Sequence, residues 1–167
     1  MDIEHDLNAL AQTLGKHLKK RNLTLTLAES CTGGLCAEVI TRIAGSSAWF
    51  ECGFITYSNR SKELLLNISE FTLDTYGAVS EATAIEMAMG AHSISGASLS
   101  AAVTGIAGPT GGSQEKPVGT VCFAWMGIDR ELATATHHFK GNRLEIRKQS
   151  TKTLIEGLIA LTLSTDL

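Results

Sequence analysis

The sequence predicts a three-layer α/β/α sandwich, with a mostly parallel sheet and an antiparallel edge hairpin. Helical and strand patterns alternate along most of the chain, which favours parallel strands joined by helices. Late in the chain, two strand patterns follow one another around a short turn, which is typical of a hairpin. The 167 residues show no linker, repeat or low-complexity tract, so residues 1–167 are expected to form a single domain.

Each element is predicted from its periodicity and its flanking residues. The first helix shows apolar residues at helical spacing, and a later one starts at Ser80, whose hydroxyl suits an N-cap. The expected helices cover residues 3–20, 33–45, 59–66, a segment beginning at 80, and 142–162. The expected strands cover residues 23–28, 50–57, 97–103, 118–126 and 132–139.

Composition excludes several classes of function. The chain is 44% hydrophobic and 19% charged, and its formal net charge of −3 leaves no basic footprint for nucleic acid. No run approaches the ~18 apolar residues of a membrane span, and the amino terminus lacks a signal-peptide pattern. We therefore expect a cytoplasmic protein that binds neither nucleic acid nor a membrane.

The cysteine and histidine patterns argue against a metal site. The four cysteines include no CxxC pair, and three of them lie in apolar runs, as reduced core residues do. His137 and His138 are adjacent in a strand pattern, so their rings point to opposite faces. No metal or cofactor is expected.

The first segment suited to chemistry is Glu29–Gly34, between a strand and a helix. Gly33 and Gly34 would let a ligand approach unpaired backbone N–H groups at a helix start, where a phosphate or an oxyanion is stabilised. Ser30 and Thr32 place hydroxyls beside those donors. The alternative is that one of these hydroxyls only caps the helix. Cys31 is a competing nucleophile, because a helix N-terminus lowers a thiol pKa.

The second segment runs from Tyr57 to Lys62. If Ser58 is the N-cap of the short helix, Tyr57 and Lys62 occupy the two positions that meet in a hydrophobic staple. A phenol and an amine would then meet at the carboxyl end of a strand, where a desolvated lysine can act as a base. The alternative is a purely structural staple in which the lysine stem covers the ring.

The third segment is a glycine-rich loop from Thr104 to Gly112, followed by residues 116–120. Backbone amides of such a loop can wrap a phosphate when it directly follows a strand. The loop lacks the Gly-Lys-Ser/Thr ending of a P-loop, and a flexible turn is the alternative. Arg143 and Arg147 lie one turn apart on the last helix, where they either bind an anion or face solvent. Ser46 and Ser47 follow Gly45 and are further hydroxyl candidates for the pocket.

These motifs together resemble the CinA carboxy-terminal domain family, also called the PncC family. The resemblance covers essentially the whole chain in the right order, without the additional amino-terminal domain of full-length CinA proteins. It is carried by residues 27–34, 45–47, 57–59, 62, 77–81, 104–109 and 116–120.

The resemblance implies an activity, and roles for individual residues. The reaction would convert nicotinamide mononucleotide and water to nicotinate mononucleotide and ammonia, in a homo-oligomer without a metal. Ser30 would be the nucleophile, with Tyr57 and Lys62 as the activating pair and Ser47 as a further hydroxyl. Residues expected to bind the nucleotide are Thr32, Gly33, Gly34, Ser46, Thr104, Gly105, Gly108 and Arg143.

Two other functions stay open at this point. One is a catalytically inactive nucleotide-binding or regulatory module of the same family. The other is a thiol enzyme that uses Cys31.

Overall fold

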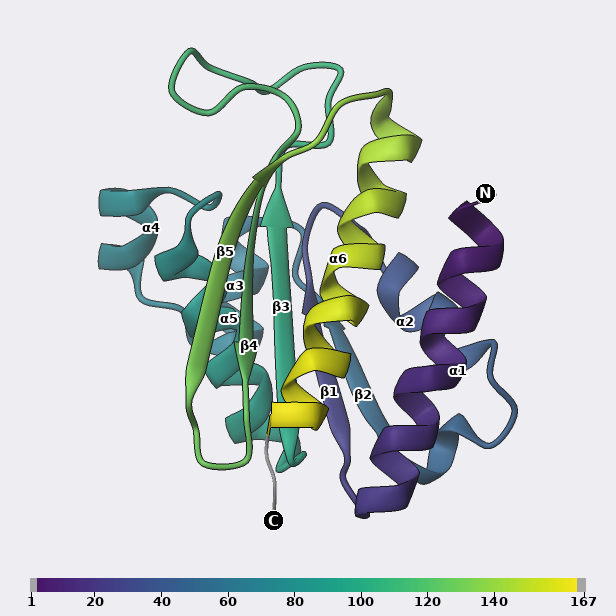
Figure 1. Ribbon diagram of the computed structural model, residues 1–167. Coiled ribbons are helices and arrows are strands. Elements are labelled where there is room, and N and C mark those ends of the chain that lie inside the picture. Colours follow the sequence, from purple (N-terminus) through teal and green to yellow (C-terminus); the bar gives the residue numbers. More distant parts are fainter. Residues whose placement is uncertain (1–2, 165–167) are drawn as a thin grey trace.

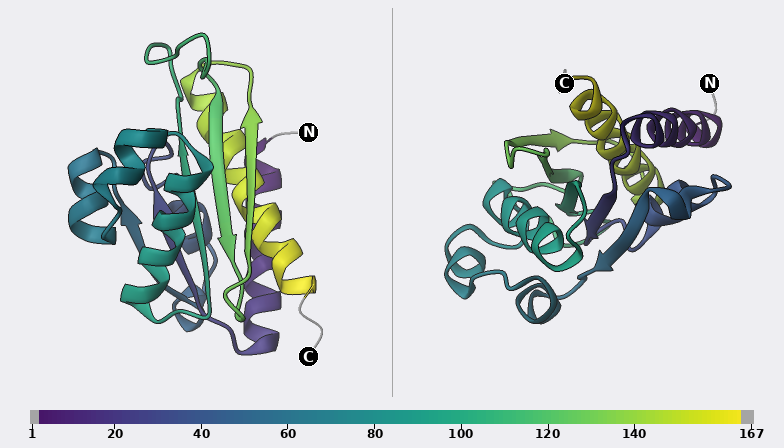
Figure 2. Two further views of the ribbon diagram at one scale, coloured as in Figure 1. Left: turned by 90° about the vertical axis from the view of Figure 1, so that its left-hand side faces the viewer. Right: turned by 90° about the horizontal axis from the view of Figure 1, so that it is seen from below.

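The computed structural model describes residues 3–164, which form a five-stranded mixed sheet between two layers of helices (Figures 1 and 2). The strand order is β2-β1-β3-β4-β5. β1 pairs in parallel with β2 and with β3, whereas β4 and β5 run antiparallel. The strands are β1 (Leu25–Glu29), β2 (Phe50–Ile55), β3 (Leu99–Gly105), β4 (Thr120–Met126) and β5 (Leu132–His138).

The helices divide between the two faces of the sheet. One face carries α1 (Ile3–Arg21), α2 (Leu35–Thr41) and α6 (Arg143–Ser164). The other carries α3 (Asn59–Leu66), α4 (Glu70–Tyr76) and α5 (Glu81–Ser95). A short 3₁₀ helix, Ser46–Ala48, leads into β2. The predicted fold class is confirmed.

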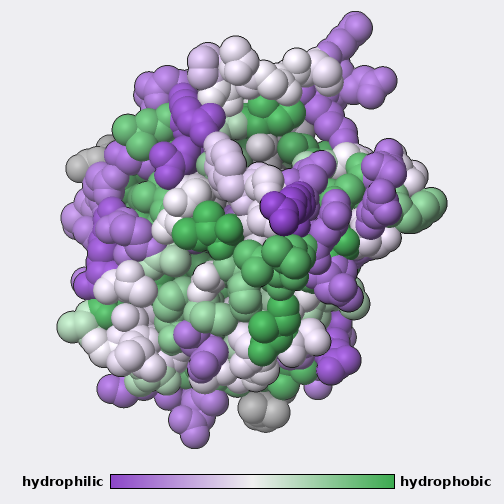
Figure 3. All heavy atoms as spheres, turned by 180° about the vertical axis from the view of Figure 1, so that it is seen from behind, coloured by the Kyte–Doolittle hydropathy of each residue, from purple (hydrophilic) through white to green (hydrophobic). Residues whose placement is uncertain are grey.

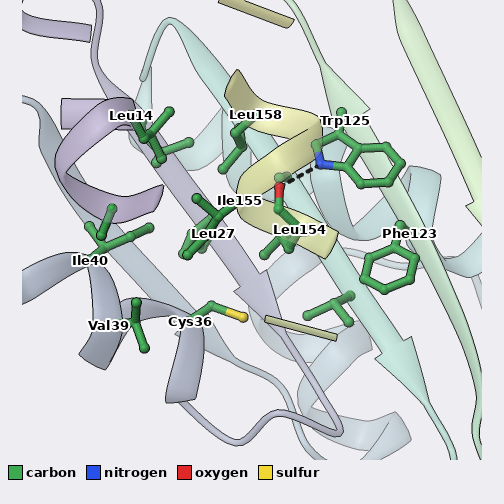
Figure 4. Close-up of a cluster of buried hydrophobic side chains, with 14 of the residues drawn as sticks. Leu14, Leu27, Cys36, Val39, Ile40, Phe123, Trp125, Leu154, Ile155 and Leu158 are labelled. Carbon is green, nitrogen blue, oxygen red and sulfur yellow. Dashed lines mark hydrogen bonds between the residues drawn. The ribbon is translucent and has the colours of Figure 1, made fainter. Parts of the chain in front are cut away.

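The larger apolar core lies between the sheet and the layer of α1, α2 and α6 (Figure 4). Leu27 of β1 and Leu14 of α1 are both fully buried there. The indole of Trp125 stacks on Phe123 and donates a hydrogen bond of 2.9 Å to the Leu154 carbonyl of α6. Burial of this apolar area is the main force that fixes α6, and therefore its first turn, against the sheet.

The sequence patterns placed most elements within a few residues, with two differences. α2 ends at Thr41 rather than near Gly45, and α4 was not predicted. α4 has only seven residues, of which Thr72 and Leu73 are buried, so its apolar periodicity is too short to detect. Ser80 caps α5 as predicted, because its Oγ accepts a hydrogen bond from the Thr83 N–H.

The surface of the α3–α5 layer is rich in exposed apolar side chains, which gather near the centre of the rear view (Figure 3). Leu64 is 73% exposed and Phe71 is 68% exposed. Within residues 3–164, no helix is both long and apolar enough to cross a membrane.

Candidate active site

A pocket of about 270 Å³ lies at the edge of the sheet where the three parallel strands β1, β2 and β3 end. Ligands of open α/β sheets bind at this edge. The volume is close to the lower end of the range for small-molecule sites, about 300–1,000 Å³. Its lining comes from all three predicted segments and from α6: Ser30, Cys31, Tyr57, Asn59, Lys62, Ala78, Val79, Thr104, Gly105, Ile106, Ala107, Gly108, Thr110, Gly111 and Arg143.

Ser30 and Lys62 are in direct contact in the floor of this pocket. The Nζ of Lys62 lies 2.9 Å from the Oγ of Ser30 and 2.8 Å from the carbonyl oxygen of Thr56. Lys62 is 1% exposed and Ser30 is 8% exposed. Ser30 occupies the first position after β1, and Lys62 lies on the inward face of α3, so the parallel pairing of β1 with β2 brings them together.

Burial changes the acid–base character of this lysine. Desolvation disfavours the charged form and lowers the pKa of Lys62 from 10.5 to about 8. A substantial fraction of the amine is therefore neutral near pH 8, where its lone pair can accept the proton of the Ser30 hydroxyl. This pairing of a hydroxyl with a neutral lysine is the arrangement of a serine nucleophile and its base.

The carboxylate of Glu29 occupies the start of α2. It accepts hydrogen bonds from the N–H groups of Gly34, Cys36 and Ala37 at 2.8–3.1 Å, and from the Thr32 hydroxyl at 2.6 Å. Those N–H groups were predicted to receive a phosphate or an oxyanion. That prediction is wrong for this helix start, because the chain supplies its own anion there.

Thr32, Gly33 and Gly34 shape the turn and do not line the pocket. Gly33 and Gly34 both have positive φ angles, of 58° and 96°, a conformation that side chains disfavour. Thr32 is fully buried and its hydroxyl faces Glu29. These three residues were expected to contact the nucleotide, and in the structure they form the turn after Ser30 instead of the pocket lining.

Tyr57 and Arg143 form the rim of the pocket. Tyr57 is 59% exposed, and its hydroxyl accepts a hydrogen bond of 2.7 Å from Arg143 Nη2. Nη1 of the same arginine donates to the carbonyl oxygen of Gly108, also at 2.7 Å. Ser58 is the N-cap of α3 as predicted, with a capping box to Ser61. The staple between Tyr57 and Lys62 is not formed, because the phenol turns to α6 and the lysine turns inward.

The glycine-rich loop is anchored to its surroundings at several points. Thr104 is buried and its Oγ1 donates to the Ala78 carbonyl at 2.7 Å, which joins two pocket walls. The N–H of Ile106 bonds to the carbonyl of Thr120, and Lys116 Nζ reaches the Tyr76 carbonyl. Gly105 and Gly108 line the pocket as predicted. The loop therefore forms a defined wall rather than a flexible turn.

Comparison with known proteins places this architecture in a family. A family model described as the CinA C-terminal domain matches residues 7–162. The chain belongs to the CinA C-terminal domain family. It is 52% identical to a nicotinamide-nucleotide amidohydrolase PncC of Enterobacter agglomerans over 147 residues, 88% of this chain and 90% of the relative. The PncC of Escherichia coli K12 is 48% identical over 155 residues, 93% of this chain and 94% of that protein.

Solved structures of the same family share the fold. A competence/damage-inducible protein from Agrobacterium tumefaciens superposes with a TM-score of 0.91 at 44% identity, covering 93% of this chain and 95% of that one. One from Klebsiella pneumoniae gives 0.92 at 32% identity, covering 96% and 99%. The predicted membership of this family is confirmed.

Ser46 and Ser47 lie far from the site of this CinA-family domain. They form the 3₁₀ turn just before β2, at the amino end of that strand, whereas Tyr57 and Lys62 follow its carboxyl end. A strand of six residues separates the two ends by about 20 Å. The expectation that these hydroxyls join the pocket is therefore wrong for a single chain.

Cys31 lines the pocket but has the wrong acid–base character for a thiol nucleophile. Burial raises the pKa of its thiol to about 12, with a smaller contribution from the negative charge of Glu29. The lowering expected at a helix start is outweighed by the desolvation of the buried thiol. The thiol-enzyme alternative loses its physical basis.

Sequence reasoning missed several groups that build the site. Glu29 and Thr56 bond to the turn around Ser30 and to Lys62, and Asn59, Ala78 and Val79 also line the pocket. A glutamate directly before a Ser-x-Thr-Gly-Gly turn was a usable signal, since acidic residues favour the first turn of a helix. The Thr56 carbonyl carried no signal, because every residue has one.

Proposed function

We propose that this chain hydrolyses the carboxamide of nicotinamide mononucleotide, giving nicotinate mononucleotide and ammonia. The observation that carries the proposal is the buried contact of 2.9 Å between Ser30 Oγ and Lys62 Nζ in the pocket floor. The names of the PncC relatives support an amidohydrolase, and the residues that would perform the reaction are our assignment.

The first half-reaction would form an acyl-serine. Neutral Lys62 accepts the hydroxyl proton of Ser30 while Oγ attacks the carboxamide carbon. We assign the backbone N–H of Cys31, the residue after the nucleophile, as a donor to the tetrahedral oxyanion. The N–H groups of Ser30 and Gly33 already bond to Val103 and to Ser30 carbonyls. The carbon–nitrogen bond then breaks, and the Lys62 ammonium gives its proton to the departing amide nitrogen, which leaves as ammonia.

The second half-reaction would return the enzyme to its starting state. Lys62, neutral again, accepts a proton from a water molecule as the water oxygen attacks the ester carbon. The bond from that carbon to Ser30 Oγ breaks, and Lys62 returns the proton to Oγ. Nicotinate mononucleotide leaves as a carboxylate, and its acid proton passes to the released ammonia, so that one water is consumed and ammonium is the second product.

Recognition of the nucleotide would come from the rim. The guanidinium of Arg143 has five N–H donors, and the Tyr57 hydroxyl and Gly108 carbonyl take two of them. The remaining donors can bind a phosphate, a geometry for which arginine is well suited. Asn59, Thr104 and the backbone of Gly105 and Gly108 are the polar groups available to the ribose and the carboxamide.

The experiment that tests the proposal is an ammonia-release assay with nicotinamide mononucleotide, nicotinamide riboside and free nicotinamide. We expect turnover of the mononucleotide, weaker turnover of the riboside, and a loss of roughly 1,000-fold or more in Ser30→Ala. Tight binding of the mononucleotide without turnover would favour the inactive nucleotide-binding module instead. If Ser30→Ala retains turnover, Ser30 is not the nucleophile, although the proposed amidase activity would still stand.

The quaternary state is part of the proposal, and we propose a homo-oligomer. Most exposed large apolar side chains of the described residues fall in residues 55–94, and their gathering on one face of Figure 3 is typical of an interaction surface. β2 is also an edge strand, whose unpaired backbone groups can pair with a second copy across a two-fold axis. Sedimentation velocity of the wild type and of Leu64→Glu tests this: the variant should shift to a monomer.

A further inference from the structure

We infer that Glu29 is a positioning residue for the reaction: with the Thr32 hydroxyl, its carboxylate holds the turn that keeps Ser30 within hydrogen-bonding distance of Lys62. The inference rests on the proposed function for its catalytic consequence, but the contacts that support it are independent of that function.

Glu29 belongs to a closed ring of bonds around the nucleophile. Its backbone carbonyl accepts the N–H of Thr56 at 2.9 Å, and the Thr56 carbonyl accepts Lys62 Nζ at 2.8 Å. Lys62 Nζ also reaches Ser30 Oγ, and Ser30 is covalently joined to Glu29. Any rotation of the Glu29 backbone therefore moves the nucleophile and its base relative to each other.

The side chain of Glu29 fixes the other end of the turn. It is fully buried, and the four groups around its two oxygens are all donors: the Thr32 hydroxyl and the N–H groups of Gly34, Cys36 and Ala37. A carboxylate accepts hydrogen bonds and donates none, so it matches this set. A glutamine in its place would turn an N–H₂ group toward backbone N–H groups, which repel it.

A second contact holds the turn from the side of α6. Arg147 donates to the carbonyl oxygen of Thr32 through Nη2 at 2.6 Å and through Nε at 3.2 Å. Glu29 therefore holds the Thr32 hydroxyl and the Gly34 N–H, while Arg147 holds the Thr32 carbonyl, and neither Glu29 nor Arg147 lines the pocket. Gly33 and Gly34 have positive φ angles and carry no side chain that could fix the turn by packing, so these hydrogen bonds supply its rigidity.

The consequence is catalytic because attack geometry tolerates little error. A displacement of about 1 Å at the reacting atoms can lower a rate by about 100-fold. Glu29 itself does not line the pocket, so its loss should lower kcat and leave KM almost unchanged.

The test compares two substitutions of Thr32 that separate hydrogen bonding from packing. Thr32→Ser keeps the hydroxyl but removes a methyl group, whereas Thr32→Val keeps the volume and removes the hydroxyl. We expect kcat within about threefold of wild type in Thr32→Ser and about tenfold lower in Thr32→Val, both with unchanged KM. Glu29→Gln should lose about 100-fold in kcat, and Glu38→Gln, which changes an exposed carboxylate on α2, should leave kcat unchanged.

Amide hydrogen exchange of residues 33–37 is the second readout and needs no activity. Exchange should accelerate at least about tenfold in Thr32→Val and Glu29→Gln, but not in Thr32→Ser, while α5 stays protected. A packing role would reverse the order of the two Thr32 variants, and that result would overturn the inference. If the wild type shows no amidase activity, the proposed function fails, and exchange still decides whether the clamp exists.

Discussion

The floor and the rim of the pocket differ in almost every physical property. The floor is a serine and a lysine that are 8% and 1% exposed, whereas Tyr57 on the rim is 59% exposed and Arg143 beside it is exposed too. In the floor, Ser30 directly follows β1 and Lys62 lies on α3, the helix after β2, whereas the rim joins Tyr57, which follows β2, to α6. This difference fits the proposed division of roles, in which burial tunes the acid–base chemistry of the floor and the accessible rim binds the substrate.

The largest expected effect is on the floor. Lys62→Met removes the base but fills the same buried space, so kcat should fall by about 100-fold or more. Steady-state ammonia release measures it, and Lys20→Met on the exposed face of α1 is the control. If Lys62→Met keeps more than a tenth of the wild-type rate, a group other than Lys62 acts as the base.

The pH profile of the wild type tests the same residue without a mutation. Lys62 must be neutral to accept a proton, and its pKa of about 8 lies below the usual 10.5. We expect kcat/KM to rise with pH, about tenfold per unit below pH 8, and to level off above it. An apparent pKa near 6 or near 10 in the kcat/KM profile would contradict the assignment of this ionisation to the buried Lys62.

The rim should show its effect in binding. Arg143→Gln removes the charge that would contact the phosphate, so KM for nicotinamide mononucleotide should rise by about 10- to 50-fold with kcat within threefold. The same substitution should hardly change KM for nicotinamide riboside, which lacks the phosphate. Arg130→Gln, in the exposed turn between β4 and β5, is the matched control. A fall in kcat with unchanged KM would mean that Arg143 acts in the chemical step and not in substrate binding.

Tyr57 sharpens the comparison because it was predicted to join the base. Its hydroxyl bonds to Arg143, so Tyr57→Phe should lower kcat/KM by less than about tenfold, mainly through KM. Measurement with both the mononucleotide and the riboside separates the two roles. A loss of 100-fold in kcat would make the phenol a proton carrier and extend the reaction to the rim.

The smallest expected effect is outside both regions. Ser47→Ala should leave kcat and KM within about twofold of wild type, because Ser47 lies at the opposite edge of the sheet. The same assay measures it, with Ser30→Ala as the positive control. A large loss would mean that a second copy of the chain brings this hydroxyl to the pocket.

The sequence predicted the fold well where a pattern was long or a residue was special. The alternation of helix and strand, the hairpin, and the caps of α3 and α5 all followed from periodicity and from serine at a helix start. Ser30, Lys62, Gly105, Gly108 and Arg143 were all placed in the pocket, since the carboxyl ends of parallel strands meet at one edge. α4 was missed because seven residues are too few for a periodic signal.

The sequence by itself determined which residue types follow the strands at this edge of the sheet, because the succession of elements and the positions of hydroxyl, lysine and glycine residues are read along the chain. Only the tertiary structure decided the burial and the hydrogen-bond partners of each of these residues. It buries Lys62, turns Tyr57 toward Arg143, and gives the start of α2 to Glu29 rather than to a ligand. The physical reason is that burial, desolvation and hydrogen-bond competition depend on neighbours distant in the chain, and sequence spacing does not record them.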